Sequence, residues 1–375
     1  MRTWRVERRS VKIVSFGSFF FLEKFHMAKI AVIRGDGIAN EVMPEAEEIL
    51  LAAANTVSFP VDFTHFDWGS DRYLREGRGM PEDACDIIRE GFDAVFQGAI
   101  GDPRVPGSIV QEQVIMGIRN GLDAYANVRP CRLYHEDLTP LKGRGKGEID
   151  HVVFRENTEG LYVNVGGLFK QGTPDEVALQ EEIHTYKGVE RVVRAAFSFA
   201  ERHGRRKVTV ADKAGGLRFA GPVWRRVWEE VRADFPDIET NAMHIDAVAM
   251  EIIRHPGDFD VIVTENMFGD ILSDITSALV GGVGLAPSAN LNMEGVSMFE
   301  PVHGTAPDIY GQGIANPVAA ILTAAMLLDH LGCAEGAAAI HRAVEEAIEA
   351  GERTGDIGGT LSTRACGEAI RKRLP

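Results

Sequence analysis

Short apolar runs alternate with longer segments of helical periodicity along most of the chain. The runs have the length and β-branched content of buried strands, at 29–33, 61–66, 93–101, 207–213 and 259–266. The longer segments repeat apolar residues at helical spacing, at 39–54, 81–90, 189–204, 222–235 and 316–332. This alternation predicts an α/β fold with a largely parallel sheet flanked by helices. Between these elements, 143–147 is typical of a flexible turn and the Gly-rich stretch 164–175 of an extended arm.

The first 26 residues do not share this pattern. Basic residues precede a short apolar run at 14–22, as in a signal peptide, but Glu23 and Lys24 interrupt it and no small-residue cleavage site follows. The run is too short to span a bilayer. We therefore expect residues 1–26 to be an upstream extension outside the fold, with an organelle transit peptide as the alternative.

Composition narrows the class of partner. The 375 residues carry a formal net charge of −15 and no basic block that could hold nucleic acid or an anionic membrane. The four scattered cysteines show neither zinc-ligand spacing nor disulfide density. We therefore expect a cytoplasmic protein whose ligand is a small molecule.

Three arginines are candidates for binding an organic acid. Arg119 and Arg129 lie in IRNGLDAYANVRP, and Arg155 lies in FRENTEG. Arginine can hold a carboxylate with two parallel hydrogen bonds, so a set of three suits a di- or tricarboxylate. The chain has 40 Lys and Arg residues, however, and on the residues alone these three could equally be ordinary surface arginines.

Two aspartates lie four residues apart in FGDILSDI, which is predicted to be helical. Asp270 and Asp274 would then share one helical face, where like charges repel unless a cation lies between them. Hard oxygen ligands favour Mg²⁺ or Mn²⁺, and Asp246 in HIDAVAM is a further candidate ligand. The alternative is a solvated acidic face, but the apolar neighbours Ile271 and Leu272 predict that this helix packs against a core.

A candidate acid–base pair consists of Tyr162 and Lys213. Tyr162 could donate a proton, and Lys213, at the end of the strand-like KVTVADK, could act as a base. On the residues alone, a core tyrosine and a surface lysine explain these positions equally well. The loop at 300–317 is rich in Gly, Pro, His and Asn and can wrap a nucleotide. GDGIAN at 35–40 does not match the dinucleotide-binding pattern G-x-G-x-x-G.

In this order and spacing the motifs resemble the β-decarboxylating dehydrogenases, the family of 3-isopropylmalate, isocitrate, homoisocitrate and tartrate/D-malate dehydrogenases. The resemblance extends from about Lys29 to the C-terminal GDIGGTLSTRACGEAIRKRL. Each motif is short, but agreement of many independent segments in one order is specific. The resemblance implies a two-domain isopropylmalate dehydrogenase-like fold. Its cofactor-binding domain would be 27–124 plus 281–375, with an inserted substrate and dimerisation domain at 125–280.

The resemblance also implies roles for the polar residues. Arg119, Arg129 and Arg155 would hold the carboxylates of a malate moiety. Tyr162 would protonate the enolate left after carbon dioxide departs, and Lys213 would help to remove the hydroxyl proton, directly or through water. The implied reaction is the oxidative decarboxylation of a 2-hydroxy dicarboxylic acid, with hydride transfer to a nicotinamide.

A divalent metal and a second subunit follow from the same resemblance. Asp246, Asp270 and Asp274 would bind Mg²⁺ or Mn²⁺. In this family the equivalents of Lys213 and Asp246 come from the neighbouring subunit. A working site therefore implies at least a homodimer, which could pair further into a tetramer.

The loop that follows Glu300 resembles the family's adenosine-binding loop. Its candidate contacts to the cofactor are His303, Gly304, Thr305, Ala306, Asp308 and Asn316. At Asp308 a carboxylate can accept hydrogen bonds from both ribose hydroxyls of NAD, and it repels the extra phosphate of NADP. NADP-using relatives place a lysine and a tyrosine at this position and the next. We therefore expect NAD.

Substrate choice in this family depends on the helix before Arg119, here QEQVIMGIRN. The positions seven, four and three residues before the arginine are Glu112, Ile115 and Met116, as in isopropylmalate enzymes, and they predict an apolar substituent. Isocitrate enzymes carry serine six before and asparagine four before, where this chain has Gln113 and Ile115. We rank 3-isopropylmalate, with 2-oxoisocaproate as product, narrowly ahead of tartrate or D-malate, which the phrases APSANLN and PDIYG favour.

Three positions depart from the family pattern. Gly215 follows Lys213 by two residues where the family usually has asparagine, Ala39 replaces a glycine, and Glu265 stands where many relatives have Gly, Asp or Thr. A non-catalytic regulatory subunit of the same fold is the main alternative. Such a subunit would be expected to lose the tyrosine, the lysine or a metal aspartate, and this chain keeps all of them. A plain nucleotide-binding module would leave the arginines and aspartates without a role.

Overall fold

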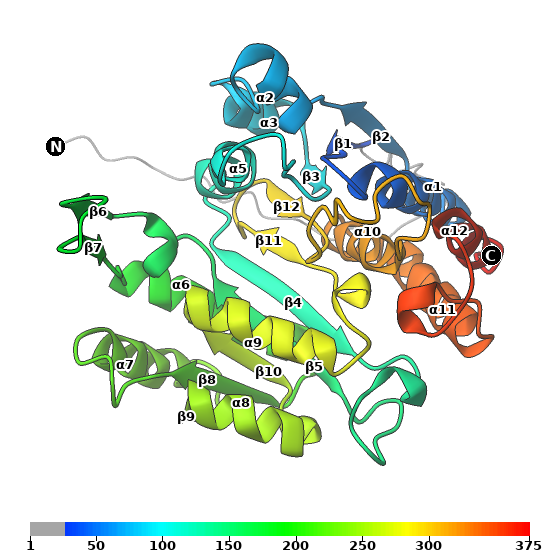
Figure 1. Cartoon of the computed structure of the whole chain (residues 1–375). Coiled ribbons are helices and arrows are strands. Elements are labelled where there is room, and N and C mark those ends of the chain that lie inside the picture. The colour runs from blue at the N-terminus through cyan, green and yellow to red at the C-terminus, as the bar shows by residue number, and fades with distance from the viewer. Residues whose placement is uncertain (1–26) are drawn as a thin grey trace, which may run out of the picture.

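The computed structural model describes residues 27–375, so the predicted upstream extension at 1–26 lies outside the described residues. Within them, a ten-stranded sheet forms the centre and helices cover both of its faces (Figure 1). In sheet order the strands are β2 (Val61–His65), β1 (Ala28–Ile33), β3 (Ala94–Gln97), β12 (Ser297–Phe299), β11 (Ala289–Leu291), β4 (Ala126–Arg132), β5 (Asp150–Glu156), β10 (Val261–Thr264), β8 (Lys207–Asp212) and β9 (Glu239–His244).

The sheet is mostly parallel. The pairs β12–β11, β11–β4 and β4–β5 are antiparallel, and the other neighbouring strands run parallel. Long connections carrying helices join the parallel strands, as parallel pairing requires. The predicted α/β class, with a largely parallel sheet flanked by helices, is confirmed.

Helices alternate with the strands along the chain. The α-helices are α1 (Ala39–Thr56), α2 (Ser70–Glu76), α3 (Ala84–Gly91), α4 (Ile109–Gln111), α5 (Gly117–Gly121), α6 (Tyr186–Arg202), α7 (Ala220–Arg232), α8 (Ile245–Arg254), α9 (Asn266–Ala278), α10 (Val318–His330), α11 (Ala334–Glu349) and α12 (Thr363–Arg371). A π-helical segment, η1 (Glu112–Met116), joins α4 to α5. Short 3₁₀ segments occur at Glu136–Leu138, Leu161–Val163, Pro256–Asp258, Val283–Leu285 and Gly355–Ile357.

Every element predicted from the sequence pattern is present, and the differences lie at element ends. The strand predicted at 93–101 ends at Gln97, because the residues after it turn back toward the loop that follows β1. There Asp36 donates its backbone N–H to Ala99 O at 2.7 Å, and its carboxylate accepts from Gly101 N at 2.7 Å. The strand predicted at 259–266 ends at Thr264, and the next two residues begin a helix instead.

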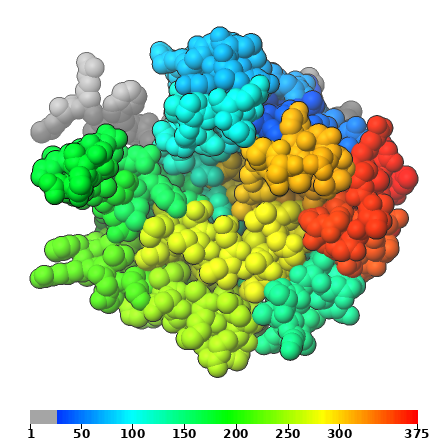
Figure 2. All heavy atoms as spheres, in the orientation of Figure 1, coloured from blue at the N-terminus to red at the C-terminus, as the bar shows by residue number. Residues whose placement is uncertain are grey.

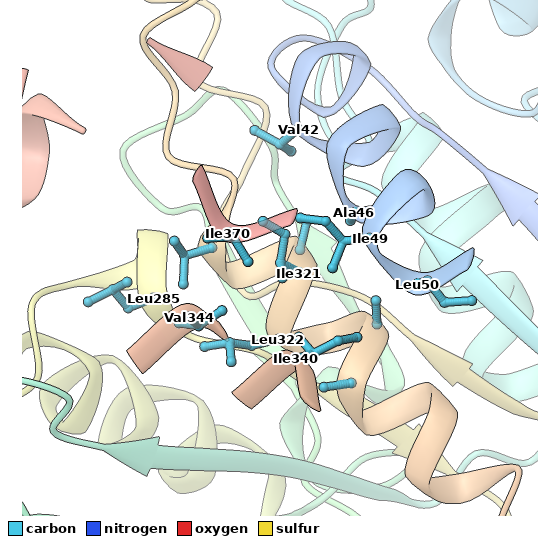
Figure 3. Close-up of a cluster of buried hydrophobic side chains, with 14 of the residues drawn as sticks. Val42, Ala46, Ile49, Leu50, Leu285, Ile321, Leu322, Ile340, Val344 and Ile370 are labelled. Atoms are coloured by element: carbon cyan, nitrogen blue, oxygen red, sulfur yellow. The ribbon is translucent and has the colours of Figure 1, made fainter. Parts of the chain in front are cut away.

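The buried side chains follow the alternation of each strand. On β1, Ile30 and Val32 join a large cluster with α1, α10, α11 and α12, whereas Ala31 and Ile33 point to the opposite face. Figure 3 shows side chains that these four helices bring into the large cluster. At the other end of the sheet, α6 and α7 pack on one face and α8 and α9 on the other.

The sheet is continuous across the two predicted domains. The antiparallel pair β11–β4 joins the strands of 27–124 and 281–375 to those of 125–280. Three of the buried clusters nevertheless each lie on one side of this pair, whereas the large cluster with α1 and α10 also includes Cys131 and Leu133 of 125–280. The division into a cofactor domain and an inserted domain stays a prediction that this arrangement supports.

Two apolar surfaces are left open to solvent. The first is a hairpin, β6 (Gly166–Phe169) paired with β7 (Val177–Gln180), which projects from the body as the predicted arm (Figure 1). All eight of its strand residues are exposed, including Leu168 and Phe169. The second lies on α8 and α9. The predicted packing of this helix against a core is confirmed through Leu272, which is buried, but the adjacent Ile271 is 55% exposed.

No helix within residues 27–375 combines the length and apolar character needed to cross a membrane.

His151 on β5 should make the fold sensitive to acid. Its side chain is fully buried, and neither ring nitrogen has a hydrogen-bond partner among the described residues. Burial lowers the pKa of His151 from 6.5 to about 4. Between these values the unfolded chain binds a proton that the folded chain does not. Stability is therefore lost as the pH falls through this window, by about 2 kcal/mol at pH 5.

We expect His151→Leu to remove that part of the acid sensitivity. Urea unfolding at pH 7.5 and pH 5.0 should show a drop in unfolding free energy that is smaller in the variant by about 2 kcal/mol. His255, whose side chain is half exposed, provides the matched control as His255→Leu. Equal drops in the parent and in His151→Leu would contradict the prediction.

Candidate active site

Two carboxylates on α9 form the centre of the candidate site. Asp270 and Asp274 lie one turn apart on this helix, as predicted. Both come within reach of Nη1 of Arg129, at 3.6 Å for Asp270 and 4.0 Å for Asp274. Partial burial first, and then the neighbouring Asp270 carboxylate, raise the pKa of Asp274. The pair is therefore a place where added positive charge is favourable.

Arg129 and Arg155 reach α9 from neighbouring strands. Arg129 lies on β4 and Arg155 on β5, both almost fully buried. Arg129 donates to Ser273 Oγ at 2.6 Å, and Arg155 donates through Nε to Asn266 Oδ1 at 2.8 Å and through Nη1 to Asp270. The antiparallel β4–β5 pairing thus directs two guanidinium groups onto the helix that carries the aspartates.

Burial makes these two arginines receptive to an anion. It lowers the pKa of Arg129, and it lowers the pKa of Arg155 to about 9, with the positive charge of Arg129 adding to the effect on Arg155. Asp270 opposes the shift in both. Nε of Arg129 has no hydrogen-bond partner among the described residues. A bound carboxylate would supply the missing negative charge and acceptors.

Arg119 lines the same cavity as Arg129. The cavity has a volume of about 140 Å³, and Arg119, Arg129, Ile115, Glu300 and His303 are among the residues that line it. Nε of Arg119 donates to Glu300 Oε1 at 3.1 Å. In Figure 2 the cyan, yellow and orange parts of the surface border a recess. Arg119, Arg129 and the start of the loop after Glu300 thus line one cavity.

The predicted specificity residues lie in the π-helical segment, and they do not all face the cavity. Ile115 lines it, together with the apolar side chains of Ile100 and Val302. Glu112 is exposed and accepts a hydrogen bond from Ser108 Oγ at 2.5 Å, outside the lining. Met116 is partly buried and is also outside the lining. A substrate contact by these two residues stays a prediction.

Tyr162 lies in the short 3₁₀ segment Leu161–Val163, next to Asp270. Its hydroxyl donates to Asp270 Oδ2 at 3.1 Å, and its ring lies 5.4 Å from the guanidinium carbon of Arg155. Burial, and then the negative charge of Asp270, raise the pKa of Tyr162. The hydroxyl therefore keeps its proton at neutral pH, as an acid catalyst must.

Lys213 and Asp246 form a separate pair. Lys213 Nζ lies 2.6 Å from Asp246 Oδ1, and this hydrogen bond lowers the pKa of Asp246. Both side chains are substantially exposed. Among residues 27–375 no group of three His, Cys, Asp or Glu side chains is placed to hold a metal ion. A single chain therefore brings Asp270 and Asp274 together but does not add Asp246 to them.

The candidate cofactor loop is anchored to the loop after β1. Thr305 O accepts the backbone N–H of Ile38 at 3.0 Å, and a Cβ at Gly37 would come within 2.2 Å of that same oxygen. Gly37 has φ +57°, so glycine is required there for two reasons. GDGIAN does not match the dinucleotide-binding pattern, but it packs against the candidate nucleotide loop and binds it through this backbone hydrogen bond.

His303 and Asn316 are the buried members of the cofactor set. Nδ1 of His303 lies 3.0 Å from Gly304 O, while its Nε2 is buried without a partner among the described residues. Burial lowers the pKa of His303, so the ring is neutral. Asn316 donates to Asp356 Oδ2 at 3.0 Å. Gly304 and Asp308 are exposed, as contacts for a ligand would be, and Thr305 and Ala306 lie partly buried between them.

Three polar partners in the site were not predicted from the sequence. Glu300 binds Arg119, Ser273 binds Arg129, and Asp356 binds Asn316. Each lies next to a motif that was singled out, since Glu300 opens the candidate loop and Ser273 precedes Asp274. A rule that buried arginines need nearby acceptors would have drawn attention to Glu300.

The residues present fit both groups that the resemblance implies. The Asp270 and Asp274 carboxylates are hard oxygen donors of the kind that Mg²⁺ and Mn²⁺ prefer. The buried, unpartnered Nε2 of His303 and the exposed loop around it offer a polar group and backbone to a nucleotide.

Known proteins resemble this chain over most of its length. The family model described as isocitrate/isopropylmalate dehydrogenase matches residues 29–370. The chain is 43% identical to a 3-isopropylmalate dehydrogenase of Thermobifida fusca over 348 residues, covering 92% of this chain and 97% of that protein. It is 44% identical to a probable tartrate dehydrogenase/decarboxylase of Bacillus subtilis, covering 92% and 98%. The structure of isocitrate dehydrogenase from Methylococcus capsulatus superposes with a TM-score of 0.85 at 36% identity, covering 93% and 99%.

The family model and the relatives support a decarboxylating dehydrogenase. Within that class, the chain belongs to the isocitrate/isopropylmalate dehydrogenase family, which confirms the resemblance found in the sequence.

Proposed function

We propose that this chain is an NAD-dependent, metal-requiring dehydrogenase that oxidatively decarboxylates a 2-hydroxy dicarboxylic acid, with 3-isopropylmalate as its main substrate. One observation carries the proposal. Arg119 and Arg129 line the same cavity as His303 of the candidate cofactor loop, and Arg129 also contacts both aspartates of α9. Carboxylate binding, metal binding and nucleotide binding therefore converge on one place.

The chain's own residues account for binding and proton transfer. Arg119, Arg129 and Arg155 hold the carboxylates of the substrate and keep its reacting carbons next to Asp270. Lys213 takes the proton from the substrate hydroxyl. Tyr162 holds a proton on its hydroxyl and delivers it to the carbon that has lost carbon dioxide. The retention of all these groups supports an active enzyme rather than a regulatory subunit.

The cofactors supply what no side chain can. Bound NAD would accept a hydride, and a bound divalent cation would act as a Lewis acid toward the substrate oxygens. His303, Gly304, Thr305, Ala306, Asp308 and Asn316 would hold the NAD, and Asp270 and Asp274, with Asp246 of a second subunit, would hold the cation.

A second copy of the chain would complete the site. Asp246 at the start of α8 is turned to Lys213 and is not grouped with the α9 aspartates. The neighbouring surface is apolar and exposed, with Met250 and Ile253 on α8 and Ile271 on α9. Packing this surface against its counterpart would bury it and bring the Lys213–Asp246 pair of each subunit to the other subunit's Asp270. The homodimer is therefore part of the proposal.

The cavity supports a substrate with an apolar substituent. Ile115, Ile100 and Val302 form its apolar part, next to the guanidinium groups of Arg119 and Arg129. A substrate with a branched alkyl group and two carboxylates is likewise apolar on one side and charged on the other. Tartrate or D-malate remains the second candidate, because a relative with 44% identity is named a probable tartrate dehydrogenase/decarboxylase.

A substrate panel tests the proposal. Purified protein with NAD and Mn²⁺ should reduce NAD in the presence of 3-isopropylmalate, and should do so more efficiently than with D-malate, tartrate or isocitrate. Removal of the metal with a chelator should abolish the signal. A protein that forms no metal-dependent NADH with any of the four acids is not the enzyme proposed.

The pocket assignment predicts a change of preference in Ile115→Asn. The polar side chain removes an apolar contact, so kcat/KM for 3-isopropylmalate should fall relative to that for D-malate by about 10-fold or more. Ile109 lies on α4, directly before the π-helical segment, is 37% exposed and is outside the cavity lining, so Ile109→Asn is the matched control. An unchanged ratio in Ile115→Asn would remove the evidence for the apolar subsite.

A further inference from the structure

Glu265 stands at the junction of the segments that build the site. It precedes the first residue of α9 and is only 3% exposed. Its two carboxylate oxygens accept the backbone N–H groups of Met267 at 2.9 Å and Phe268 at 2.6 Å. These donors would otherwise be unpaired at the start of the helix. A buried glutamate thus closes the N-terminus of the helix that carries Asp270 and Asp274.

The same carboxylate lies close to the segment that carries Tyr162. A Cβ at Gly160 would lie 3.1 Å from Glu265 Oε2 and 3.0 Å from the Cβ of Asn266, so this loop has no space between it and α9. Gly160 has φ +81°, which favours glycine and lets the chain turn closely over the carboxylate. Tyr162 follows two residues later and reaches Asp270.

The next residue, Asn266, connects α9 to Arg155. Its side chain accepts from Arg155 Nε at 2.8 Å and donates to Glu159 O at 2.8 Å. The first turn of α9 is therefore bound to β5 and to the loop after it. Glu265 is the group that holds the backbone of this turn in place.

The base of the arm also lies close to Glu265. His184 lies 2.8 Å from Glu182 through Nε2 and accepts a hydrogen bond from Trp224 Nε1 at 3.2 Å. Burial raises the pKa of Glu265, and the charge of Glu182 adds to this, while backbone hydrogen bonds and His184 oppose it. The carboxylate therefore depends on the helix N-terminus for its stabilisation, and the helix depends on it in return.

We propose that Glu265 is a positioning residue for the metal site: it fixes the first turn of α9 against the Arg155–Tyr162 segment and thereby sets where the carboxylates of Asp270 and Asp274 stand. This inference rests on the proposed function, because it presupposes that the two aspartates bind a divalent cation.

Direct Mn²⁺ binding to the full-length protein tests the role. The free-ion signal in electron paramagnetic resonance gives the Kd without any turnover. In Glu265→Gln, which keeps the volume but loses the charge, the Kd for Mn²⁺ should rise by about 10-fold, as for other groups that orient metal ligands. Glu265→Asp keeps a carboxylate at the cap but withdraws it from Gly160, and its Kd should rise by only about threefold. In assays, the KM for Mn²⁺ should rise by the same factors while kcat at saturating Mn²⁺ stays within about twofold.

Ser362 provides the matched control. It caps α12 by accepting the Ala365 N–H at 3.2 Å, far in sequence from the metal site. Ser362→Ala loses a helix cap of the same kind and should leave the Kd for Mn²⁺ unchanged. If Glu265→Gln does not fold, the threefold change in Glu265→Asp decides the matter.

The possible outcomes distinguish a failure of the positioning role of Glu265 from a failure of the proposed function. Glu265 variants that bind Mn²⁺ as the parent does would overturn the positioning role while leaving the metal site intact. An equal loss of affinity in Ser362→Ala would also overturn it, since the effect would then be one of general stability. A parent protein that binds no Mn²⁺ would instead overturn the proposed function.

Discussion

An Asp270→Asn variant should lose about 10³-fold or more in kcat/KM, because one carboxylate serves three functions in the site. Its Oδ1 pairs with the guanidinium groups of Arg155 and Arg129, and its Oδ2 accepts the hydroxyl of Tyr162. It is also a proposed ligand of the divalent cation. Loss of charge stabilisation at a catalytic metal amounts to several kcal/mol, and each 1.36 kcal/mol is a tenfold change in rate.

The change should affect the chemistry and the metal but not the fold or the nucleotide loop. We expect circular dichroism and NADH binding, followed by fluorescence, to be unchanged, and Mn²⁺ affinity to fall sharply. The exposed Asp237→Asn is a control for the same chemical change elsewhere. An Asp270→Asn enzyme that keeps more than about a tenth of the parent kcat/KM would show that this carboxylate is not central.

The fold could be predicted because each strand and helix depends on the pattern of apolar residues within its own segment of the sequence. Short continuous apolar runs identify buried strands, and the helical spacing of apolar residues identifies helices with one buried face. The two misplaced strand ends have different reasons. Residues after Gln97 turn to contact Asp36, which is 65 residues before Gly101, so no short window of sequence shows this partner. Glu265 leaves the end of a strand to cap the helix that follows, a local contact that the apolar pattern of the strand does not reveal.

The site was only partly predictable from the sequence. Arg129, Arg155 and Asp270 were identified from their motifs, and the structure places all three in contact. The helix before Arg119 shows the limit. In an α-helix, positions seven and four before an arginine share its face, but the π-helical turn at 112–116 changes the rotation per residue. Ile115 faces the cavity and Glu112 does not.

Mixing two inactive variants should restore activity if subunits share their sites. Lys213→Ala and Tyr162→Phe should each lose about 10²–10⁴-fold in kcat, as expected for loss of a proton-transfer group. After mixed unfolding and refolding, half of the dimers are heterodimers. In each heterodimer one site combines the intact Tyr162 of one subunit with the intact Lys213 of the other. The mixture should therefore recover about a quarter of the parent activity.

The recovery distinguishes the two arrangements because it depends only on where Lys213 acts. If Lys213 served the Tyr162 of its own chain, every site in a heterodimer would lack one of the two groups, and mixing would restore nothing. The contact between Lys213 and Asp246 makes a second mixture informative. Asp246→Asn mixed with Lys213→Ala should stay inactive. Both groups of a site are contributed by the same subunit, so each site of a heterodimer lacks either the lysine or the aspartate. Recovery in that second mixture would mean that Lys213 and Asp246 act in different sites.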